Sequence, residues 1–567
     1  MLSLGVVLLA APVLLLLQYG VSYMSNPLRK IPAAHPLAPF TSLWMSSIRW
    51  RKIENATLKE AHDRLGPIVC LGPKEISVNC VKGGVRDVYA GGFEKRDAKS
   101  GYNWYGFFTN FGYVFIRSKK KEFLPETGGL MDASFDNMFS TGLNKPHSAR
   151  KRMLSNIYSK SVVTASPVLQ AQVSAILYKR LLPRLAFIYS GAEKGVFEAS
   201  SLLNASTMDV ITSYIFGLKA SSNLISNPDQ LAWFLDLYNS RRSYNFWPQE
   251  FPQLTGFLRK WFRVHMSPSW VAGANAEIEK WTKGMCDGAA NVMQQGEVQT
   301  QDVPSVYQQL SAAVAKEAKK NDMEGVDLRS VIASEVLDHL AAGFDTSGIT
   351  LTYVVHELST HRQIQSRLQQ ELKTLSPQLV ASSSPELPDP KVIDALPVLH
   401  AVIWETLRLH SAIPGPQPRF TPPQGCQLGP DAEYFVPGGV RVSASAGLLH
   451  QNEDVYERAS EWKPERWLDM ETVNEEKRKD MESRWFWAFG RSVYARRSLL
   501  LQLTGRSGGR MCVGSHLAVY SKCPTPSAKS CSPSSPTRCF SRPSTLLFRH
   551  GTSKEVVDWD CPVTVAG

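Results

Sequence analysis

The chain has 567 residues, of which 43% are hydrophobic and 20% are charged. This composition is ordinary for a globular protein with a large core, and it excludes wholesale disorder. The net charge of +12 does not indicate a nucleic-acid partner, because much of the excess lies in two short segments. Residues 491–506 hold four arginines and no acid, and residues 519–567 hold six basic side chains against three acidic ones. Nine scattered cysteines are too few for a disulfide framework and favour a reducing compartment.

The amino end, residues 1–24, carries no charged side chain, and the first charge in the chain is Arg29. About 20 apolar residues are enough to cross a bilayer as a helix. A cleaved signal peptide is the alternative, but it usually has a basic start and a small-residue cleavage site, and neither is clear in this segment. Basic residues cluster after it, which by the positive-inside rule places the rest of the chain in the cytosol. We therefore expect residues 1–24 to form one transmembrane signal anchor.

Beyond the anchor, proline, glycine and the hydrophobic period divide the chain into predicted elements. In chain order these are a stiff proline-containing linker at 27–40, a basic helix at 145–165, mostly helical patterning over 165–375, a loop at 376–390, a helix at 391–411 ended by the Pro414-Gly415-Pro416 run, and short strands within 431–448 with a turn at Pro437-Gly438-Gly439. Helix dominates, so the sequence predicts a mainly α fold with small β-sheets.

The most informative motif is the glycine-rich stretch SGGRMCVG at 507–514. A lone cysteine such as Cys512 is usually a small core side chain. Here Gly508 and Gly514 allow a tight loop and close approach to a flat ligand, and Arg510 can pair with a ligand carboxylate. The residues that follow can begin a helix whose positive end favours a thiolate. A thiolate is a ligand that lets haem iron activate oxygen.

Two further motifs precede this cysteine. In LAAGFDTSG, residues 340–348 of a helix expected over 328–360, Gly343 would leave room for dioxygen, Thr346 would orient a water and Asp345 would relay protons. The alternative is a helix with a polar patch. In ETLR, Glu405 and Arg408 lie on one helix face at i, i+3, which alone is a commonplace surface pair.

A third stretch, HELSTH at 356–361, is similar to the zinc-protease helix, but its histidines are five residues apart. At that spacing the two side chains point in different directions, whereas a spacing of four would align them. We interpret this stretch as ordinary helix surface, without a zinc ion.

Together these residues resemble the cytochrome P450 family, in its membrane-anchored form abundant in fungi. Four motifs follow the family's order: Ala342-Gly343-Phe344-Asp345-Thr346-Ser347, Glu405-Thr406-Leu407-Arg408, Pro464-Glu465-Arg466-Trp467 and Gly508-Gly509-Arg510-Met511-Cys512-Val513-Gly514. The resemblance covers roughly residues 25–490 and 507–518. It implies a prism fold, rich in α-helix, with haem b held between the helix of Thr346 and the loop of Cys512.

The resemblance also implies roles for single residues. Cys512 would be the axial ligand of the haem iron, while Asp345 and Thr346 would deliver protons to bound oxygen. Glu405, Arg408 and Arg466 would form a structural triad, and Arg419 and Arg510 would contact the haem propionates. His147 occupies the place where family members often carry a tryptophan that meets a propionate, with Arg150 or Lys151 nearby.

The implied activity is monooxygenation of a hydrophobic small molecule with dioxygen, in fungal secondary metabolism. Electrons would come from NADPH through NADPH-cytochrome P450 reductase, docked on a basic face. The protein would be a single-pass protein of the endoplasmic reticulum membrane, in contact with lipid and with its catalytic domain in the cytosol. The aromatic-rich segment 245–262 would form part of an apolar access route near the membrane.

Two departures from the family pattern stand near the end of the chain. Deleting residues 491–506 would restore the uninterrupted family motif from Phe489-Gly490 to Cys512, and Pro524 and Pro526 would stop the helix that normally follows it. Residues 521–545 hold eight serines and five prolines, which favours disorder. We therefore divide the chain into an anchor at 1–24, a catalytic domain at 25–518 with an atypical insertion at 491–506, and an atypical tail at 519–567.

The insertion and tail leave a second interpretation open. A retained in-frame intron followed by a frameshifted end would make the chain a catalytically inactive product of a damaged or mis-spliced gene, whereas a lineage-specific loop and tail would leave it active.

Overall fold

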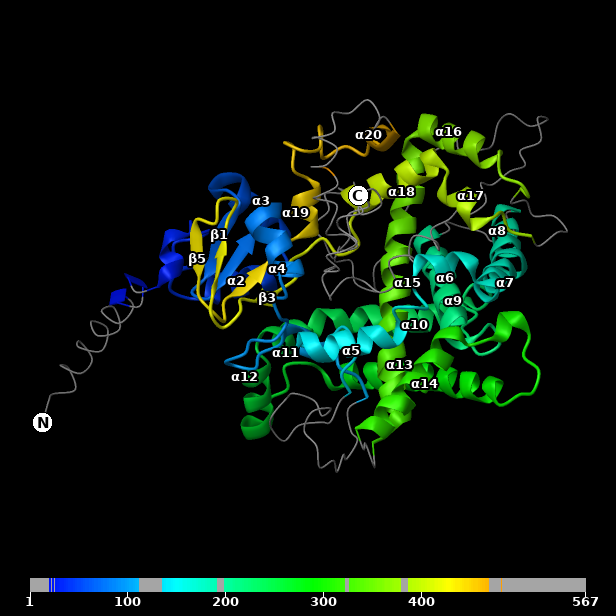
Figure 1. The fold of residues 1–567 in the computed structure, drawn as a ribbon, viewed down its shortest axis with the longest axis horizontal. Coiled ribbons are helices and arrows are strands. Elements are labelled where there is room, and N and C mark those ends of the chain that lie inside the picture. Colours follow the sequence, from blue (N-terminus) through cyan, green and yellow to red (C-terminus); the bar gives the residue numbers. More distant parts are fainter. Residues whose placement is uncertain are drawn as a thin grey trace, which may run out of the picture.

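Helices dominate the molecule, and its small sheets gather at one end (Figure 1). The computed structural model describes residues 20, 21, 23, 24, 26–111, 135–190, 198–321, 326–378, 386–468 and 481. The mainly α architecture with small β-sheets is the one predicted. The proposed anchor at 1–24 lies almost wholly outside these residues, and no helix within the described ranges is both long and apolar enough to cross a bilayer.

A four-stranded sheet and a hairpin form the β-rich end of the molecule. The strands are β1 (Ile68–Gly72), β2 (Glu75–Val78), β3 (Arg419–Phe420), β4 (Cys426–Leu428), β5 (Tyr434–Val436) and β6 (Arg441–Ser443). The larger sheet has the order β1-β2-β6-β3, in which only the β2–β6 pair is parallel, and β4 pairs antiparallel with β5. The predicted turn lies between β5 and β6, where Gly439 has a φ of +78°. This turn therefore joins two different sheets.

The segment after the proposed anchor is packed onto this sheet. Leu28, in the short helix η1 (Pro27–Lys30), is 1% exposed, and Ile31 is 3% exposed. Ala33 forms a parallel bridge with Cys70 of β1. The expectation of a stiff linker is wrong for residues 28–33, because their apolar side chains complete the core of the β-rich end.

A buried ionic cluster ties this end to the helical part. Arg49 of α2 (Leu43–Trp50) contacts Glu54, Glu75 and Glu250, and Arg441 of β6 contacts Glu75 and Glu250. Glu250 ends α11 (Phe246–Glu250), so the cluster holds that helix against the sheet. Burial alone would raise the pKa of Glu250, but the two guanidinium groups lower it to about 2.

The helical part accounts for most of residues 144–409. Its helices are α5 (Asn144–Leu154), α6 (Lys160–Ala165), α7 (Pro167–Ile176), α8 (Leu182–Tyr189), α9 (Ala199–Phe216), α10 (Pro228–Ser240), α12 (Pro252–Phe257), α13 (Ser269–Met293), α14 (Ser305–Lys320), α15 (Leu328–Thr360), α16 (Arg362–Leu372), α17 (Pro390–Asp394) and α18 (Pro397–Leu409). Near the β-rich end lie α3 (Glu54–Leu65), α4 (Arg86–Ala90) and α19 (Ala446–His450), and α20 (Glu465–Leu468) follows them in the chain.

Two predicted helices are each divided in the structure. The helix expected at 145–165 ends at Leu154, and a second helix begins at Lys160. The helix expected at 391–411 is interrupted because Leu396 is extended, with a ψ of 110°, and Pro397 starts a new helix. A residue before proline avoids the helical region, so the proline marks the boundary.

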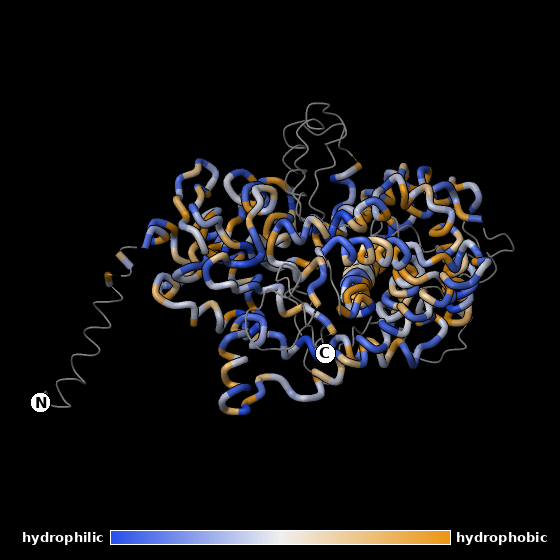
Figure 2. Tube along the Cα trace, turned by 60° about the horizontal axis from the view of Figure 1, so that its bottom comes forward, coloured by the Kyte–Doolittle hydropathy of each residue, from blue (hydrophilic) through white to orange (hydrophobic). Residues whose placement is uncertain are grey.

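The long helix α15 runs through the middle of the helical part, with the bounds that the sequence predicts (Figure 1). The side chain of Asp327 caps it by accepting hydrogen bonds from the backbone of Arg329 and Ser330. It packs closely against α9, which is buried along most of its length. Figure 2 shows many hydrophobic positions within the helical part. The core of this part includes buried side chains of both α9 and α15.

Candidate active site

Arg408 on α18 lies in a fully buried network. Its side chain is 0% exposed and donates two hydrogen bonds to Glu405, at 2.8 and 2.9 Å. It also donates to the backbone carbonyl oxygens of His450, Ala459 and Glu461, at 2.7 to 3.0 Å. All of the polar hydrogen-bonding capacity of this guanidinium is therefore used within the protein.

Glu405 collects further donors from the segment that follows α19. Arg466 Nε donates to Glu405 Oε1 at 2.9 Å, the Trp467 indole donates to Oε2 at 2.8 Å, and the Lys463 backbone donates to Oε1 at 2.9 Å. Burial alone would raise the pKa of Glu405, but the hydrogen bonds and charges of Arg408 and Arg466 lower it. The structure thus brings together the three residues expected as a triad, and it adds Trp467.

The centre of α15 carries Asp345 and Thr346. Asp345 Oδ2 accepts from Arg242 Nη2 at 2.6 Å, in a pair whose side chains are 27% and 29% exposed. Arg242 belongs to the short helix η5 (Arg241–Tyr244) after α10, and it stacks over the Tyr238 ring at 4.6 Å. Thr346 Oγ1 donates to the Ala342 carbonyl oxygen at 2.9 Å. The hydroxyl hydrogen is thus used within the helix, while its oxygen can still accept a hydrogen bond.

Opposite faces of α15 have different surroundings at this point. Ala342 is exposed, and Asp338, Ala341 and Asp345 on the same face are half-buried. A Cβ added at Gly343 would lie 2.6 Å from Ile211 Cγ1 of α9. The expectation that Gly343 leaves room for dioxygen is therefore wrong: this glycine lets two helices approach, and Ala342 is the small residue on the uncovered face.

Arg419 on β3 is a buried cation at 7% exposure. Its Nη1 donates to the Tyr105 hydroxyl at 2.6 Å and to the Pro418 carbonyl at 2.7 Å, and its guanidinium stacks over the rings of Tyr89 and Tyr105 at 5.0 and 5.3 Å. Within the described ranges it pairs with no carboxylate. A buried guanidinium without an acid partner fits a ligand carboxylate such as a haem propionate.

A chain of contacts connects Arg419 to the uncovered face of α15. Tyr105 packs edge-on against Phe139, with ring centroids 5.1 Å apart, and the Phe139 backbone N–H donates to Asp338 Oδ2 at 3.2 Å. Burial raises the pKa of Asp338 to about 6. Arg419 and the uncovered face of α15 that carries Ala342 therefore belong to one region of the molecule, and both fit haem.

The other predicted site residues are placed as follows. His147 is buried in the first turn of α5, and Arg150 is paired with Glu335 of α15 at 3.1 Å, which engages that arginine within the protein. Cys512, with Gly508, Arg510 and Gly514, lies outside the described residues, as do the insertion and the tail.

The HELSTH stretch is not ordinary surface at its centre. Glu357 is 8% exposed, and its carboxylate contacts His410 Nε2 at 2.6 Å, which joins α15 to the end of α18.

Sequence reasoning also missed Arg242, which lies 103 residues before Asp345. Its one local signal is the arginine pair at the end of α10.

The family model described as Cytochrome P450 matches residues 123–493, well over half of the chain. The chain belongs to the cytochrome P450 family. It is similar to the cytochrome P450 monooxygenase avaI of Aspergillus versicolor, with 25% identity over 446 residues that cover 77% of this chain and 91% of the relative. The cytochrome P450 monooxygenase hkm5 of Aspergillus hancockii is 28% identical over 453 residues, covering 78% and 77%. A cytochrome P450 monooxygenase of Aspergillus terreus is 26% identical over 532 residues, covering 92% and 93%.

As a fungal-type cytochrome P450, the chain is a haem-dependent monooxygenase and so an oxidoreductase. The family match ends at residue 493, before Cys512. These comparisons lend no support to the alternative of an inactive gene product.

Proposed function

We propose that this P450 oxidises a hydrophobic small molecule with dioxygen in fungal secondary metabolism, using haem b bound through Cys512. The observation that carries the proposal is the connected region of Ala342, Thr346, Phe139 and Arg419 described above. Arg419 and Arg510 would hold the haem propionates, and Gly508 and Gly514 would let the ligand loop approach the porphyrin. When bound, haem supplies the oxygen chemistry, for which the polypeptide has no group of its own.

The residues of α15 would supply protons to the site. The Thr346 oxygen can accept a hydrogen bond from a water, because its own hydrogen is held by the Ala342 carbonyl. Asp345 would exchange protons with solvent, and Arg242 holds its carboxylate in one position. The apolar side chains of Ala341 and Ala342 leave the same face open to a hydrophobic substrate.

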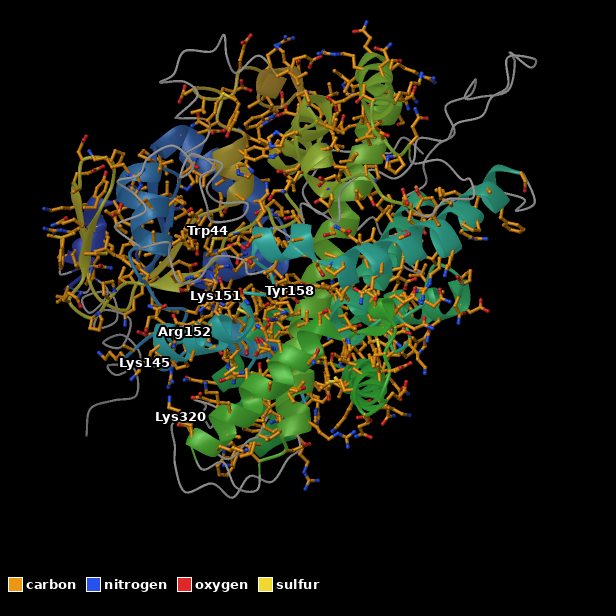
Figure 3. The ribbon with its side chains drawn as sticks, turned by 45° about the vertical axis from the view of Figure 1, so that its right-hand side comes forward. Trp44, Lys145, Lys151, Arg152, Tyr158 and Lys320 are labelled. Atoms are coloured by element: carbon orange, nitrogen blue, oxygen red, sulfur yellow. The ribbon has the colours of Figure 1, made fainter. Side chains whose placement is uncertain are left out.

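We infer that electrons come from NADPH through NADPH-cytochrome P450 reductase docked on a basic face. Figure 3 labels Lys145, Lys151 and Arg152 on α5 together with Lys320 at the end of α14, a helix that packs against α5. These cations suit a partner with an acidic docking surface. Charge reversal of Lys145 and Lys320 would then raise the KM for reductase, and an unchanged KM would contradict this docking site.

We also infer that the protein is anchored in the endoplasmic reticulum membrane by residues 1–24, with its catalytic domain in the cytosol. Exposed aromatic side chains support contact with lipid: Trp261 is 68% exposed, Phe262 63% and Phe257 51%, in and beside the short helix η6 (Leu258–Phe262). The helix η6 directly follows α12, which Figure 1 shows at one corner of the described part, and it belongs to the segment expected to line an apolar access route. Carbonate-resistant membrane association, lost on deleting 1–24, is the expected result.

The test compares the full chain with a variant that lacks residues 491–506. The reduced, carbon-monoxide-bound spectrum should show a thiolate-type Soret band in at least one of the two, and Cys512→Ser should abolish it. A thiolate band in both chains indicates a genuine insertion, whereas a band only in the deletion variant indicates a mis-spliced product. A Soret band that Cys512→Ser leaves unchanged would overturn the proposed ligand.

A further inference from the structure

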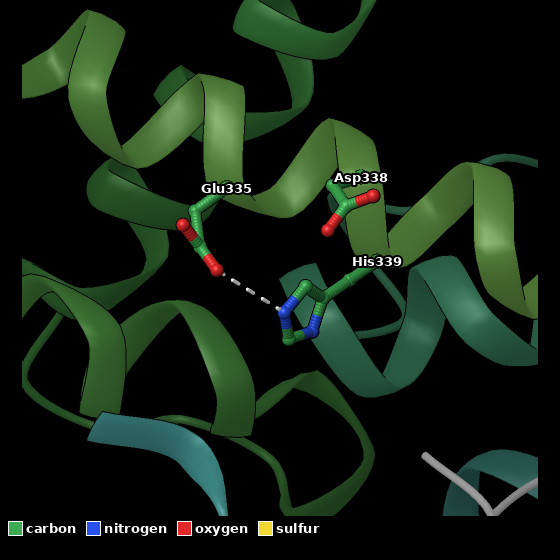
Figure 4. Close-up of side chains that lie close together, drawn as sticks. All are labelled: Glu335, Asp338 and His339. Carbon is green, nitrogen blue, oxygen red and sulfur yellow. Dashed lines mark ion pairs between the residues drawn. The ribbon is translucent and has the colours of Figure 1, made fainter. Parts of the chain in front are cut away.

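One turn of α15 carries three side chains of the kinds that bind metal ions. Glu335, Asp338 and His339 lie at i, i+3 and i+4, and one ligand atom from each lies within 4.8 Å of the others (Figure 4). The turn lies two helical turns before Thr346, and haem chemistry does not require it.

Two of the atoms in this cluster are buried without a hydrogen-bond partner. Glu335 is 3% exposed and His339 is 7% exposed, yet Glu335 Oε1 and His339 Nε2 make no hydrogen bond. The two atoms face each other across 3.6 Å. At this distance the two atoms form an ion pair when His339 is protonated, but the pair is too long for a good hydrogen bond. A cation bound between them would give both buried atoms a closer partner.

The other polar atoms of the same side chains are held in place. Arg150 Nη1 donates to Glu335 Oε2 at 3.1 Å, and the Phe139 backbone N–H donates to Asp338 Oδ2 at 3.2 Å. The Tyr158 hydroxyl lies 2.9 Å from His339 Nδ1. If Nδ1 carries the imidazole proton, Tyr158 accepts it and the Nε2 lone pair points at Glu335. A metal-binding histidine usually has its second nitrogen fixed in this way.

We propose that the turn from Glu335 to His339 binds one divalent transition-metal ion, and Zn²⁺ fits its ligands best. One imidazole nitrogen and two carboxylate oxygens would bind the ion, and a fourth position would stay open. Ligand distances of roughly 2.0–2.2 Å require ligand atoms roughly 3–4 Å apart. The 3.6 Å between Glu335 and His339 already satisfies this requirement. The half-buried Asp338 carboxylate, whose ligand atom lies within 4.8 Å of the other two, would have to turn inward.

Nearby cations limit how tightly an ion can bind. Arg150 shares the Glu335 carboxylate, and the charge of Lys95 acts on Asp338. Both oppose a dication in a region of low dielectric constant. We therefore expect micromolar affinity rather than the much tighter binding of a structural zinc site. A bound ion would brace α15 against α5 through the shared Glu335 carboxylate.

The experiment uses the full-length holoenzyme, stripped with a chelator and dialysed against micromolar Zn²⁺ with metal analysis. We expect one ion that is retained in the control His361→Gln, which changes a histidine at the C-cap of the same helix. In His339→Gln the affinity should fall by more than the 10- to 100-fold typical of losing an outer partner. Tyr158→Phe should show that smaller loss.

A second variant and a second measurement keep the test decisive. If His339→Gln does not fold, Asp338→Asn is expected to weaken Zn²⁺ binding in the same way, because its side chain is only half-buried. X-ray absorption at the zinc edge should show nitrogen and oxygen ligands alone. Sulfur at the zinc ion, equal affinity in the wild type and the variants, or no ion at micromolar Zn²⁺ would each overturn the proposal. Haem content and the carbon-monoxide spectrum, measured separately, report on the proposed function.

Discussion

Two buried arginines of this P450 differ in how far their guanidinium groups are paired within the polypeptide. Arg408 makes five hydrogen bonds to its own polypeptide, including two to Glu405. Arg419 makes two, both from one nitrogen, and has no acid within the described part of the chain. Burying a charge is costly unless it is paired. Arg408 is therefore fully paired within the polypeptide, whereas the region between β3 and α15 fits the haem that we propose for it.

The largest effect is expected from breaking the buried network around Glu405. Glu405→Gln leaves Arg408 and Arg466 buried without their counter-charge, and removing one partner of a buried pair costs about 3–5 kcal/mol. We expect the midpoint of urea unfolding to fall sharply, with little haem incorporated. Glu461→Gln is the control, because the Arg458–Glu461 pair is more than half exposed and contributes at most about 1 kcal/mol. If both variants lost the same free energy of unfolding, the buried network around Glu405 would contribute no more than an exposed ion pair.

The buried ionic cluster around Glu250 should respond to pH. The folded-state pKa of Glu250 is lowered to about 2, below its value in the unfolded chain, so its contribution is full above pH 4.5 and is lost as the pH falls toward 2. Glu250→Gln should cost up to about 3 kcal/mol at pH 7, and the difference from wild type should shrink below about pH 4. Urea unfolding at several pH values measures it. A difference that does not change with pH would show that packing, and not charge, is responsible.

In the region of Arg419, a substitution should change haem binding rather than the stability of the apoprotein. Arg419→Met removes a buried cation without an acid partner, so the apoprotein should lose little stability. Loss of a charge-assisted hydrogen bond, about 1.5–3 kcal/mol, should speed haem release roughly 10- to 150-fold. Transfer of haem to an excess of a haem-free globin measures the rate. If the rate of haem release is unchanged and the apoprotein loses much stability, then Arg419 is paired within the polypeptide, as Arg408 is.

The smallest expected effect comes from substitutions on the two faces of α15. Gly343→Ala inserts a methyl group against Ile211, and overpacking costs about 1–3 kcal/mol. Adding Ile211→Ala should recover part of that loss in thermal unfolding. Ala342→Val, on the uncovered face, should leave stability within about 0.5 kcal/mol and change haem or substrate binding instead. The reverse pattern would mean that the faces are wrongly assigned.

The sequence predicted what depends on local spacing. The i, i+3 positions of Glu405 and Arg408 place both on one helix face, and the helix expected over 328–360 matches α15. The sequence does not show which neighbour lies against each face, so the prediction that Gly343 leaves room for dioxygen is wrong. Arg242 and Tyr105 are brought to the site by packing between segments more than a hundred residues apart in sequence. Apart from the adjacent arginines at 241 and 242, no local pattern indicates such contacts.

The docking of Leu28 and Ile31 has a practical consequence for anyone shortening this protein. These side chains fill the β-rich core, and Ala33 extends its edge, so a truncation that starts after them would uncover apolar surface. A shortened version should therefore begin before Pro27, in the expectation that one beginning at Ala34 precipitates on purification. Because Asn26 donates a hydrogen bond to the Pro73 carbonyl between β1 and β2, an anchor or tag fused directly before it would lie next to the sheet.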